Sequence, residues 1–210
     1  MEQIHLGKVG LFGGTFDPIH FGHLNMAEEL MKAKNLEEVW LCPAFMNPHK
    51  IDQQSAPIGH RLKMVQLAIS DQPRFKLLDV EAKRKGPSYT VDTLRQLVAE
   101  EQARPSPRRI HLIISDELAL DFFHWHKPQE IIRLASLLIG SRLRSSKKPP
   151  PLEGDPCICR AIESGWTPTS VKGISSTEIR RKLSKGLNCE FLVPRKVLDY
   201  IYQNNLYSTV

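Results

Sequence analysis

The sequence has no long apolar segment, no paired cysteines and few aromatic residues. No part of its 210 residues approaches the roughly 20 apolar residues that a membrane-spanning helix requires. The first residues, Met-Glu-Gln-Ile-His, lack the apolar core of a secretory signal peptide, so we expect a cytoplasmic protein without a membrane partner. The four cysteines are scattered and none forms a C-x-x-C pair, which argues against a zinc or redox site. We therefore expect reduced, structural thiols and no protein-bound metal.

The chain also lacks an excess of acidic residues. Its 29 lysines and arginines outnumber 23 aspartates and glutamates, so the net charge at pH 7 is +6. A basic protein of this kind suits polyanionic ligands. Nucleic acid is one such ligand, but the basic clusters are short and are not interleaved with aromatic residues, as a base-stacking surface would be. We therefore predict small phosphate-bearing molecules as ligands and no nucleic-acid partner.

Short apolar segments alternate with segments of helical periodicity along the chain. Strands are predicted over residues 9–12, 39–42, 75–80, 111–114 and 137–140. Helices are predicted over residues 22–34 and 90–102, around Leu62, Val65 and Ile69, and between the last two strands, in a stretch that carries Trp125. This alternation predicts an α/β fold with a doubly wound, mostly parallel, Rossmann-like sheet and a small C-terminal helical part.

The predicted organisation is a single domain over residues 1–210. Residues 144–156 contain Ser-Ser-Lys-Lys-Pro-Pro-Pro and are expected to form a surface loop. Residues 171–210 are expected to hold a C-terminal motif and helices. Ligands of such sheets bind beyond the carboxyl ends of the strands, where several of the motifs below fall.

The most informative segment is Gly-Gly-Thr-Phe-Asp-Pro-Ile-His-Phe-Gly-His at residues 13–23, directly after the first predicted strand. Glycines allow a ligand to approach the backbone, and a helix start offers N–H groups and a positive dipole end to anions. His20 and His23 project from the same side of that helix start and can donate hydrogen bonds to phosphate oxygens. The alternative is a strand–turn–helix corner with surface or capping histidines. The glycine pair and the position at a strand end favour a phosphate site.

A second motif, Ile-Ser-Ser-Thr-Glu-Ile-Arg, occupies residues 174–180. With Ser175 as N-cap, Glu178 stands at the position that completes a capping box. A capping box does not account for Arg180, one turn further along the helix. Hydroxyls and amides at a helix start, followed by a guanidinium, form a cradle for phosphates.

Three further elements have both a structural and a functional interpretation. Ser88 or Thr90 is expected to cap the helix over residues 90–102, whose first amides also suit a carboxylate. Lys50 follows a strand end, where it can direct positive charge toward a phosphate, although a lysine in a loop is usually only solvated. Trp125 by itself is expected to be half-buried packing, and its functional interpretation comes only from the family resemblance given next.

The segment over residues 13–23 resembles the Gly-Gly-Thr-Phe-Asp-Pro-x-His-x-Gly-His signature of nucleotidyltransferases. Nicotinate and nicotinamide mononucleotide adenylyltransferases share that signature, and phosphopantetheine adenylyltransferases share it more loosely. The order Ile-Ser-Ser-Thr-x-Ile-Arg is similar to the C-terminal motif of the nicotinate mononucleotide enzymes. The Pro-His-Lys and Ser-Tyr-Thr-x-x-Thr-Leu segments are similar to two other elements of the same family. Class I aminoacyl-tRNA synthetases carry only the looser His-x-Gly-His, and the chain leaves no room for an anticodon-binding domain.

The resemblance implies a Rossmann-like nucleotidyltransferase that moves AMP from ATP to nicotinate mononucleotide. The products would be nicotinate adenine dinucleotide and pyrophosphate, in NAD biosynthesis, with Mg²⁺ accompanying ATP. It implies catalytic roles for His20, His23 and Arg180. It implies nucleotide contacts from Gly13, Gly14, Thr15, Phe16, His20, His23, Ser176, Thr177 and Arg180. It implies acceptor contacts from Lys50, Tyr89, Thr90, Trp125 and the acidic pair Asp116 and Glu117, with Trp125 stacking on the cationic pyridine ring.

One departure from the family pattern leaves a residue assignment open. The family usually has Gly-x-Asp about eight residues before its tryptophan, and this chain has Ser115, Asp116 and Glu117 there. Either carboxylate can stand at the acidic position. The alternatives that remain are a nicotinamide mononucleotide or phosphopantetheine acceptor, or a non-catalytic nucleotide-binding protein of the same fold. The sequence leaves the oligomeric state open.

Overall fold

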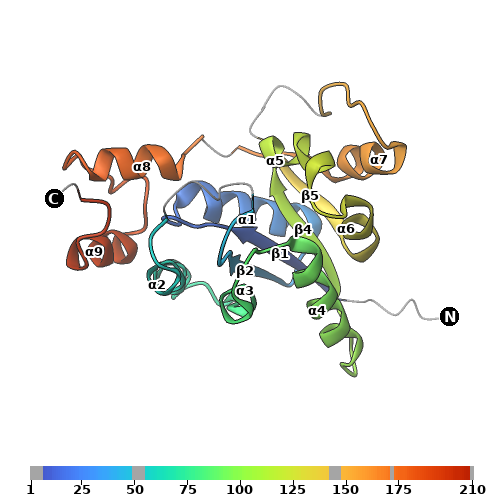
Figure 1. The fold of residues 1–210 in the computed structure, drawn as a ribbon, viewed down its shortest axis with the longest axis horizontal. Coiled ribbons are helices and arrows are strands. Elements are labelled where there is room, and N and C mark those ends of the chain that lie inside the picture. The colour runs from blue at the N-terminus through green and yellow to red at the C-terminus, as the bar shows by residue number, and fades with distance from the viewer. Residues whose placement is uncertain (1–6, 49–54, 142–147, 171–172, 209–210) are drawn as a thin grey trace.

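The computed structural model describes residues 7–48, 55–141, 148–170 and 173–208. Within these residues six strands form one sheet in which all neighbours run parallel, in the order β3-β2-β1-β4-β5-β6 (Figure 1). The strands are β1 (Lys8–Gly14), β2 (Glu38–Pro43), β3 (Phe75–Leu77), β4 (Arg109–Ser115), β5 (Ser136–Ser141) and β6 (Trp166–Pro168). The predicted parallel, doubly wound sheet is therefore confirmed. The order reverses between β1 and β4, which is where sheets of this kind bind ligands.

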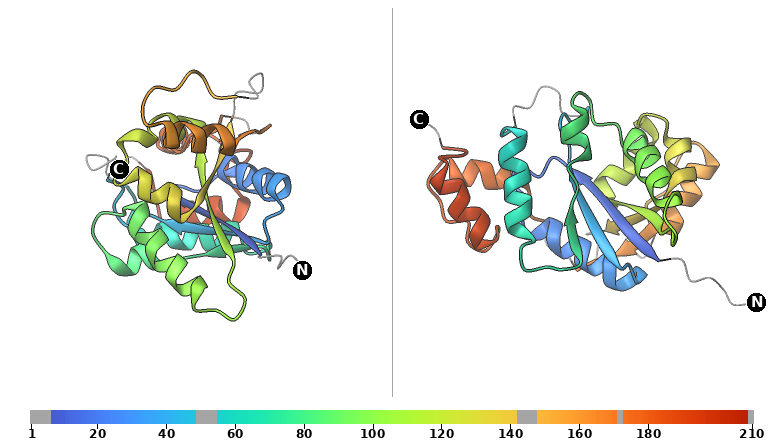
Figure 2. Two further views of the ribbon diagram at one scale, coloured as in Figure 1. Left: turned by 90° about the vertical axis from the view of Figure 1, so that its right-hand side faces the viewer. Right: turned by 90° about the horizontal axis from the view of Figure 1, so that it is seen from below.

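Helices cover both faces of the sheet (Figure 2). They are α1 (Phe21–Lys34), α2 (Ile58–Ala68), α3 (Val80–Arg84), α4 (Thr90–Gln102), α5 (Asp116–Leu120), the 3₁₀ helix η1 (Phe122–His124), α6 (Pro128–Leu134), α7 (Pro156–Gly165), α8 (Ser176–Leu183) and α9 (Arg195–Gln203). Successive strand residues point to opposite faces. Phe12 of β1 accordingly packs with α1 and α2, whereas Val9 and Leu11 pack with α4, α6 and α7. In the described part of the chain no helix is both long and apolar enough to cross a membrane.

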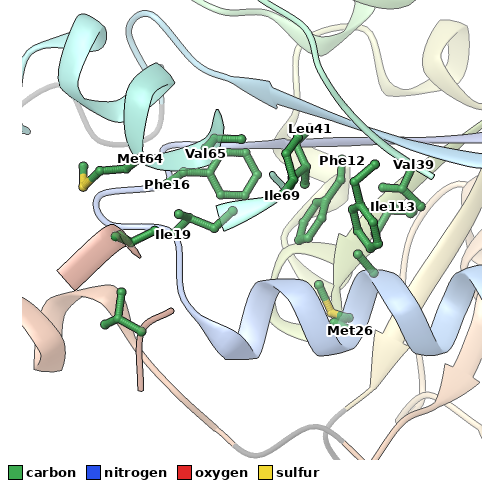
Figure 3. Packing of buried hydrophobic residues seen from close by; sticks show 14 of the residues in the cluster. Phe12, Phe16, Ile19, Met26, Val39, Leu41, Met64, Val65, Ile69 and Ile113 are labelled. Atoms are coloured by element: carbon green, nitrogen blue, oxygen red, sulfur yellow. The ribbon is translucent and has the colours of Figure 1, made fainter. Parts of the chain in front are cut away.

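Helix α1 lies close against the sheet because a glycine faces it. A Cβ atom at Gly140 of β5 would lie 2.5 Å from Cγ and Sδ of Met26, which is closer than van der Waals contact allows. Met26, Phe12, Val39 and Ile113 pack together in the core between α1 and the sheet (Figure 3). This packing holds the first turn of α1 at the carboxyl edge of the sheet.

The C-terminal helices α8 and α9 lie at the end of the molecule beyond α2, away from the strands (Figure 1). Their apolar residues continue the core that α1 and α2 form, through Ile179, Leu183, Val197, Leu198 and Ile201. The predicted C-terminal helical part is therefore present. That the whole chain is one domain stays a prediction.

Several predicted boundaries are wrong, and local chemistry explains them. The strand expected over residues 75–80 ends at Leu77, and Val80 begins α3 because Glu81 turns inward to accept a 2.7 Å hydrogen bond from Thr93 Oγ1. Trp125 does not lie in a helix but between η1 and α6. Lys127, which precedes Pro128, adopts φ 54° and ψ 55°, outside the right-handed helical region that a following proline disfavours.

Helix α7 and strand β6 were not predicted at all. Asp155 caps α7 by accepting hydrogen bonds from the amides of Cys157 and Ile158, and Pro156 occupies the first helical position. An Asp-Pro pair is a helix-start signal that could have identified this helix. Residues 148–155 of the expected 144–156 loop contain no helix or strand, and residues 142–147 lie outside the described residues.

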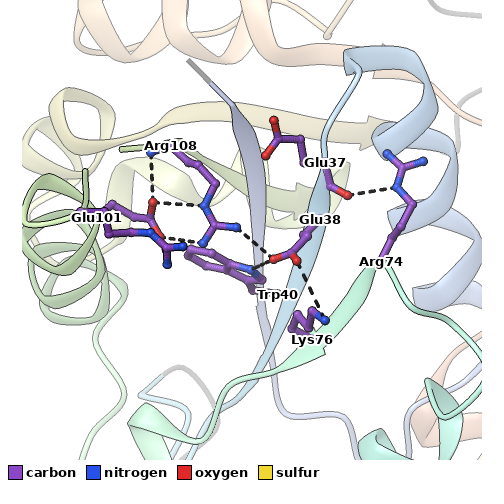
Figure 4. Close-up of polar contacts among 8 residues, drawn as sticks. Glu37, Glu38, Trp40, Arg74, Lys76, Glu101 and Arg108 are labelled. Carbon is purple, nitrogen blue, oxygen red and sulfur yellow. Dashed lines mark hydrogen bonds and ion pairs between the residues drawn. The ribbon is translucent and has the colours of Figure 1, made fainter. Parts of the chain in front are cut away.

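At the opposite, amino edge of the sheet an ion-pair network joins α4 to β2 (Figure 4). The Arg108 guanidinium donates to Glu101 Oε1 at 2.7 Å and to Glu38 Oε2 at 3.1 Å. It also lies 4.9 Å from the centre of the Trp40 ring, within range of a cation–π interaction. These contacts stabilise the edge that lies away from the ligand-binding side.

Candidate active site

The loop between β1 and α1 begins at two glycines that the sheet holds in register. Gly13 and Gly14 pair with Cys42 and Pro43 of β2, and the Gly14 carbonyl accepts a 2.9 Å hydrogen bond from Ala44 N. A Cβ atom at Gly13 would meet nothing within 4 Å, so the space beside it is open. The end of β1 therefore presents bare backbone toward the carboxyl edge of the sheet.

His20 and His23 cap the start of α1 through each other. His20 Nδ1 accepts from the His23 amide and His23 Nδ1 accepts from the His20 amide, both at 3.3 Å. The two rings stack with centroids 3.6 Å apart and 20° between their planes. An Nδ1 atom that accepts a hydrogen bond carries no proton, so each neutral ring carries its hydrogen on Nε2. The capping interpretation and the predicted same-side arrangement are both correct, and capping leaves the Nε2 edge of each ring as the donor edge.

The second motif, residues 174–180, is hydrogen-bonded to the first, residues 13–23. Ser176 Oγ donates to the Pro18 carbonyl at 3.1 Å, and Arg180 Nη1 donates to the Asp17 carbonyl at 2.8 Å. These two bonds connect residues that are 158 and 163 positions apart in the chain. The two motifs, to which the resemblance assigns contacts with the same nucleotide, are thus in direct contact.

The predicted capping box of α8 is wrong. Ser175 is the N-cap residue, but its side chain makes no capping hydrogen bond. Glu178 instead pairs with Lys182 at 3.6 Å, four residues along the same helix. With this i,i+4 pair in place, the Glu178 carboxylate is directed along the helix and not back toward its start.

The two motifs enclose a cavity of about 510 Å³. This volume lies in the range of sites for nucleotide-sized ligands. The described residues that line it come from the end of β1, the β1–α1 loop, the first turns of α1, the segment after β2, the end of β4, α5 and the start of α8. Those among the predicted site residues are Gly13, Gly14, Thr15, Phe16, His20, His23, Glu117, Ser176, Thr177 and Arg180.

Comparisons with known proteins agree with this geometry. The cytidylyltransferase-like family model matches residues 11–182. A probable nicotinate-nucleotide adenylyltransferase of Geobacillus kaustophilus is 38% identical over 203 residues, which cover 97% of this chain and 87% of the relative. A protein of Dehalococcoides mccartyi with the same description is 38% identical over 201 residues, covering 95% of this chain and 97% of the relative.

A solved structure agrees at the level of the fold. It is the nicotinic acid mononucleotide adenylyltransferase of Plasmodium falciparum complexed with NaAD, with a TM-score of 0.72 at 20% identity. The match covers 96% of this chain and 97% of that one.

The chain belongs to the nicotinate-nucleotide adenylyltransferase family.

In this family member the structure separates the two carboxylates that the sequence left open. Asp116 is buried between β4 and β5, where its Oδ1 accepts from the Glu117 amide at 3.0 Å and its Oδ2 lies 3.5 Å from Ser141 Oγ. Glu117 is exposed and lines the cavity. Ser115, at the family's glycine position, caps α5 by accepting from Leu118 N at 3.4 Å. The geometry therefore favours Glu117 as the carboxylate that faces a ligand.

Four of the predicted acceptor residues lie outside the cavity lining, namely Tyr89, Thr90, Asp116 and Trp125. The Tyr89 ring packs on His126 with centroids 4.6 Å apart, and the Trp125 ring packs on Phe122 at 5.1 Å. Tyr89 is itself the N-cap residue of α4, without a side-chain capping bond, so the expected Ser88 or Thr90 cap is wrong.

The start of α4 is nevertheless tied to the cavity wall. Ser88 Oγ accepts from Phe45 N at 2.9 Å and Ser88 N donates to Met46 O at 2.8 Å. Phe45 and Met46 line the cavity, so Thr90 follows a segment that is bonded to its wall. Lys50 lies outside the described residues.

The most important residue that the sequence analysis missed is Arg61. It is only 2% exposed and donates to the carbonyls of Thr15 at 2.9 Å, Ala44 at 2.6 Å, Phe45 at 3.1 Å and Ala56 at 2.9 Å. Burial lowers the pKa of Arg61, which the nearby Asp17 and Tyr207 counteract. A signal existed, because Arg61 stands where an apolar residue would complete the helical stripe of Met64 and Val65.

The described residues contain no group of three or more histidine, cysteine or acidic side chains arranged to hold a metal ion. Cys42 and Cys189 are buried, Cys157 is exposed, and all four cysteines are free thiols. Burial, and then the charge of Glu81, raises the pKa of the Cys42 thiol well above its usual value. This thiol is therefore protonated at neutral pH.

Proposed function

We propose that this protein transfers AMP from ATP to nicotinate mononucleotide, releasing nicotinate adenine dinucleotide and pyrophosphate. The observation that carries the proposal is the joining of the His20–His23 pair and the Ser176–Arg180 segment around one cavity. The similarity to nicotinate-nucleotide adenylyltransferases over nearly the whole chain supports the choice of acceptor.

The reaction needs alignment and charge stabilisation more than a protein nucleophile. The acceptor's 5′-phosphate is already ionised at neutral pH and attacks the α-phosphorus of ATP. The protein must hold the two phosphates in line and stabilise the charge on the α-phosphate oxygens and on the leaving pyrophosphate. In our proposal the Nε2–H groups of His20 and His23 donate hydrogen bonds to the α-phosphate oxygens. Ser176, Thr177 and Arg180 bind the β- and γ-phosphates.

The remaining roles follow from position. The backbone of Gly13, Gly14, Thr15 and Phe16 borders the nucleotide, since the Phe16 ring itself is buried against Phe12 and His23. Glu117 contacts the nucleotide or acceptor from the first turn of α5. Mg²⁺ accompanies ATP and is held mainly by phosphates and water.

Acceptor specificity is assigned to the start of α4. The amides around Tyr89 and Thr90 suit the negative charge of a pyridine carboxylate better than a neutral carboxamide. Trp125 would then stack on the pyridinium ring. Lys50 would add positive charge near a phosphate. A nicotinamide mononucleotide or phosphopantetheine acceptor is the competing candidate, as is ATP binding without turnover.

Pyrophosphate release tests the activity. Purified protein with Mg-ATP is incubated separately with nicotinate mononucleotide, nicotinamide mononucleotide and phosphopantetheine. We expect release with the first acceptor at a rate well above the other two. Release with another acceptor alone corrects the substrate, and no release with any acceptor supports the binding-protein alternative.

A substitution at His23 tests the proposed role of its Nε2 edge. In His23→Asn the side-chain oxygen can still accept the His20 amide, as asparagine does at helix caps, but nothing replaces the Nε2–H donor. We expect kcat to fall by about 100-fold or more, in the range of a lost transition-state donor, with little change in Tm. His124→Ala, which removes an exposed histidine bonded to Asp121, is the matched control with unchanged kcat. Near-normal turnover of His23→Asn would refute the role.

A further inference from the structure

A largely buried polar cluster forms part of the cavity wall, and we call its four residues Asp17, Arg61, Arg180 and Tyr207 the Asp17 cluster. Asp17 is 3% exposed and stands in the loop between the glycine pair and His20. Its side chain is reached from three separate parts of the chain. Carboxylates are rarely buried to this extent unless charged or hydrogen-bonding groups surround them.

The two carboxylate oxygens of Asp17 have different partners. Oδ1 accepts from the Ala56 amide at 3.2 Å and from the Tyr207 hydroxyl at 2.6 Å. Oδ2 lies 3.8 Å from Arg180 Nη1, the same nitrogen that donates to the Asp17 carbonyl at 2.8 Å. The Arg180 guanidinium is therefore anchored to Asp17 while it lines the cavity.

Tyr207 follows α9, near the end of the chain, and reaches back to a loop 190 positions earlier. Burial raises the pKa of its phenol, and the charge and hydrogen bond of Asp17 raise it further. The phenol is thus protonated at any physiological pH and donates its hydrogen to the carboxylate. Its oxygen also lies 4.0 Å from Met64 Sδ, so the ring is packed against α2.

We propose that Tyr207 is a positioning residue for ATP. Its hydroxyl holds Asp17 Oδ1, which keeps Oδ2 and the backbone carbonyl of Asp17 as the anchor of Arg180. This inference rests on the proposed function, in which Arg180 binds the β- and γ-phosphates. Without the hydroxyl, Oδ1 loses a donor and the carboxylate is drawn toward the nearest remaining cation, Arg180. A closer pair withdraws positive charge from the cavity and weakens ATP binding.

The chain supplies a matched comparison for Tyr207. Tyr200 of α9 is also partly buried, and its hydroxyl lies 2.8 Å from His60 Nδ1 of α2. This bond joins the same C-terminal segment to α2 but does not involve the β1–α1 loop. Loss of either hydroxyl removes one hydrogen bond, whereas only loss of the Tyr207 hydroxyl reaches Asp17.

The test is the kinetics of Tyr207→Phe and Tyr200→Phe, with each substrate varied in turn. For Tyr207→Phe we expect KM for ATP to rise about 5- to 10-fold, which is less than the tenfold or more of a hydrogen bond lost directly to a charged group, because the phenol acts on ATP only through Arg180. KM for nicotinate mononucleotide and kcat stay within about 2-fold, because the lost interaction concerns binding of one substrate. Tyr200→Phe leaves all three constants unchanged and lowers Tm by about as much as Tyr207→Phe does.

A second measurement establishes that Tyr207 acts through Arg180. In an Arg180→Lys background, Tyr207→Phe has little further effect on ATP affinity measured by calorimetry. Fully additive effects overturn the proposal, as does an equal rise in both KM values or a Tm loss in Tyr207→Phe far beyond that of Tyr200→Phe. Calorimetric ATP binding requires no acceptor, so a wrong acceptor assignment leaves this result interpretable.

Discussion

Replacing Arg61 by methionine tests how the β1–α1 loop is held. Methionine keeps most of the apolar stem of the side chain and removes the guanidinium. Four main-chain carbonyls then lose a donor, those of Thr15, Ala44, Phe45 and Ala56. All four belong to segments that lie beside or within the cavity wall.

The expected magnitude follows from burial. Each hydrogen bond from a charged group contributes about 1.5–3 kcal/mol, but removing the guanidinium also removes the cost of burying it. Each buried acceptor left without a donor costs about 1–3 kcal/mol, so with four carbonyls affected and the burial cost of the guanidinium relieved we expect a loss of about 3–5 kcal/mol in free energy of unfolding. For a chain of this length each 1 kcal/mol corresponds to about 2–4 °C, so we expect Tm to fall by about 10 °C.

Thermal and urea denaturation followed by circular dichroism measure this loss. Lys63→Met is the matched control, since Lys63 is exposed on the same helix and bonds only to Gln66 among the described residues. Its effect is expected to stay within about 0.5 kcal/mol. Arg61→Lys should fall between the two, because one ammonium cannot reach four carbonyls. A Tm for Arg61→Met within 2 °C, roughly 0.5–1 kcal/mol, of the Lys63→Met value would refute the reasoning.

Two further predictions concern stability away from the cavity. Burial acts to raise the pKa of Glu101, but the hydrogen bonds and charge of Arg108 outweigh burial, so the pKa is lowered in the folded protein. The ion pair therefore stabilises the fold fully above the unfolded-state pKa, and this stabilisation is lost as the pH falls through the lowered, folded-state pKa. Between pH 5 and pH 3, Tm should therefore fall more steeply in the unaltered protein than in Glu101→Gln, and parallel Tm curves would contradict this. Gly165→Ala would place a Cβ atom 2.5 Å from the Leu137 carbonyl oxygen, so we expect a loss of about 1–3 kcal/mol in urea denaturation. Gly59→Ala in α2 meets no atom within 4 Å and should instead gain a few tenths to about 1 kcal/mol, so a similar response of the two variants would count against close packing at Gly165.

Much of the fold was predictable because its signals are local. The strand-and-helix alternation indicated a parallel sheet, and α4 begins and ends at the predicted residues 90 and 102. Boundaries failed where a tertiary contact overrides local preference. Val80 has high strand propensity, but Glu81 beside it is drawn to Thr93, which lies 12 positions away.

In the candidate site, too, local features were predictable from the sequence and tertiary contacts were not. The two proposed phosphate-binding motifs are short continuous segments, so their residue types and spacing were enough to predict His20, His23 and Arg180 as site residues. Capping histidines were visible as an alternative, but only the structure showed that His20 and His23 cap through each other. The choice between Asp116 and Glu117 was not accessible, since adjacent residues differ only in which one the turn after β4 buries.

The sequence alone determined the family of this protein and its predicted chemistry, because glycines, histidines and an arginine in fixed local order are typical of a phosphate-binding strand–turn–helix. Only the tertiary structure decided what supports that chemistry. The buried Arg61 and the contact of Tyr207 with Asp17 join segments far apart in the chain. No local pattern encodes such contacts, since they arise only when the sheet brings β1, α2 and the C-terminal segment together.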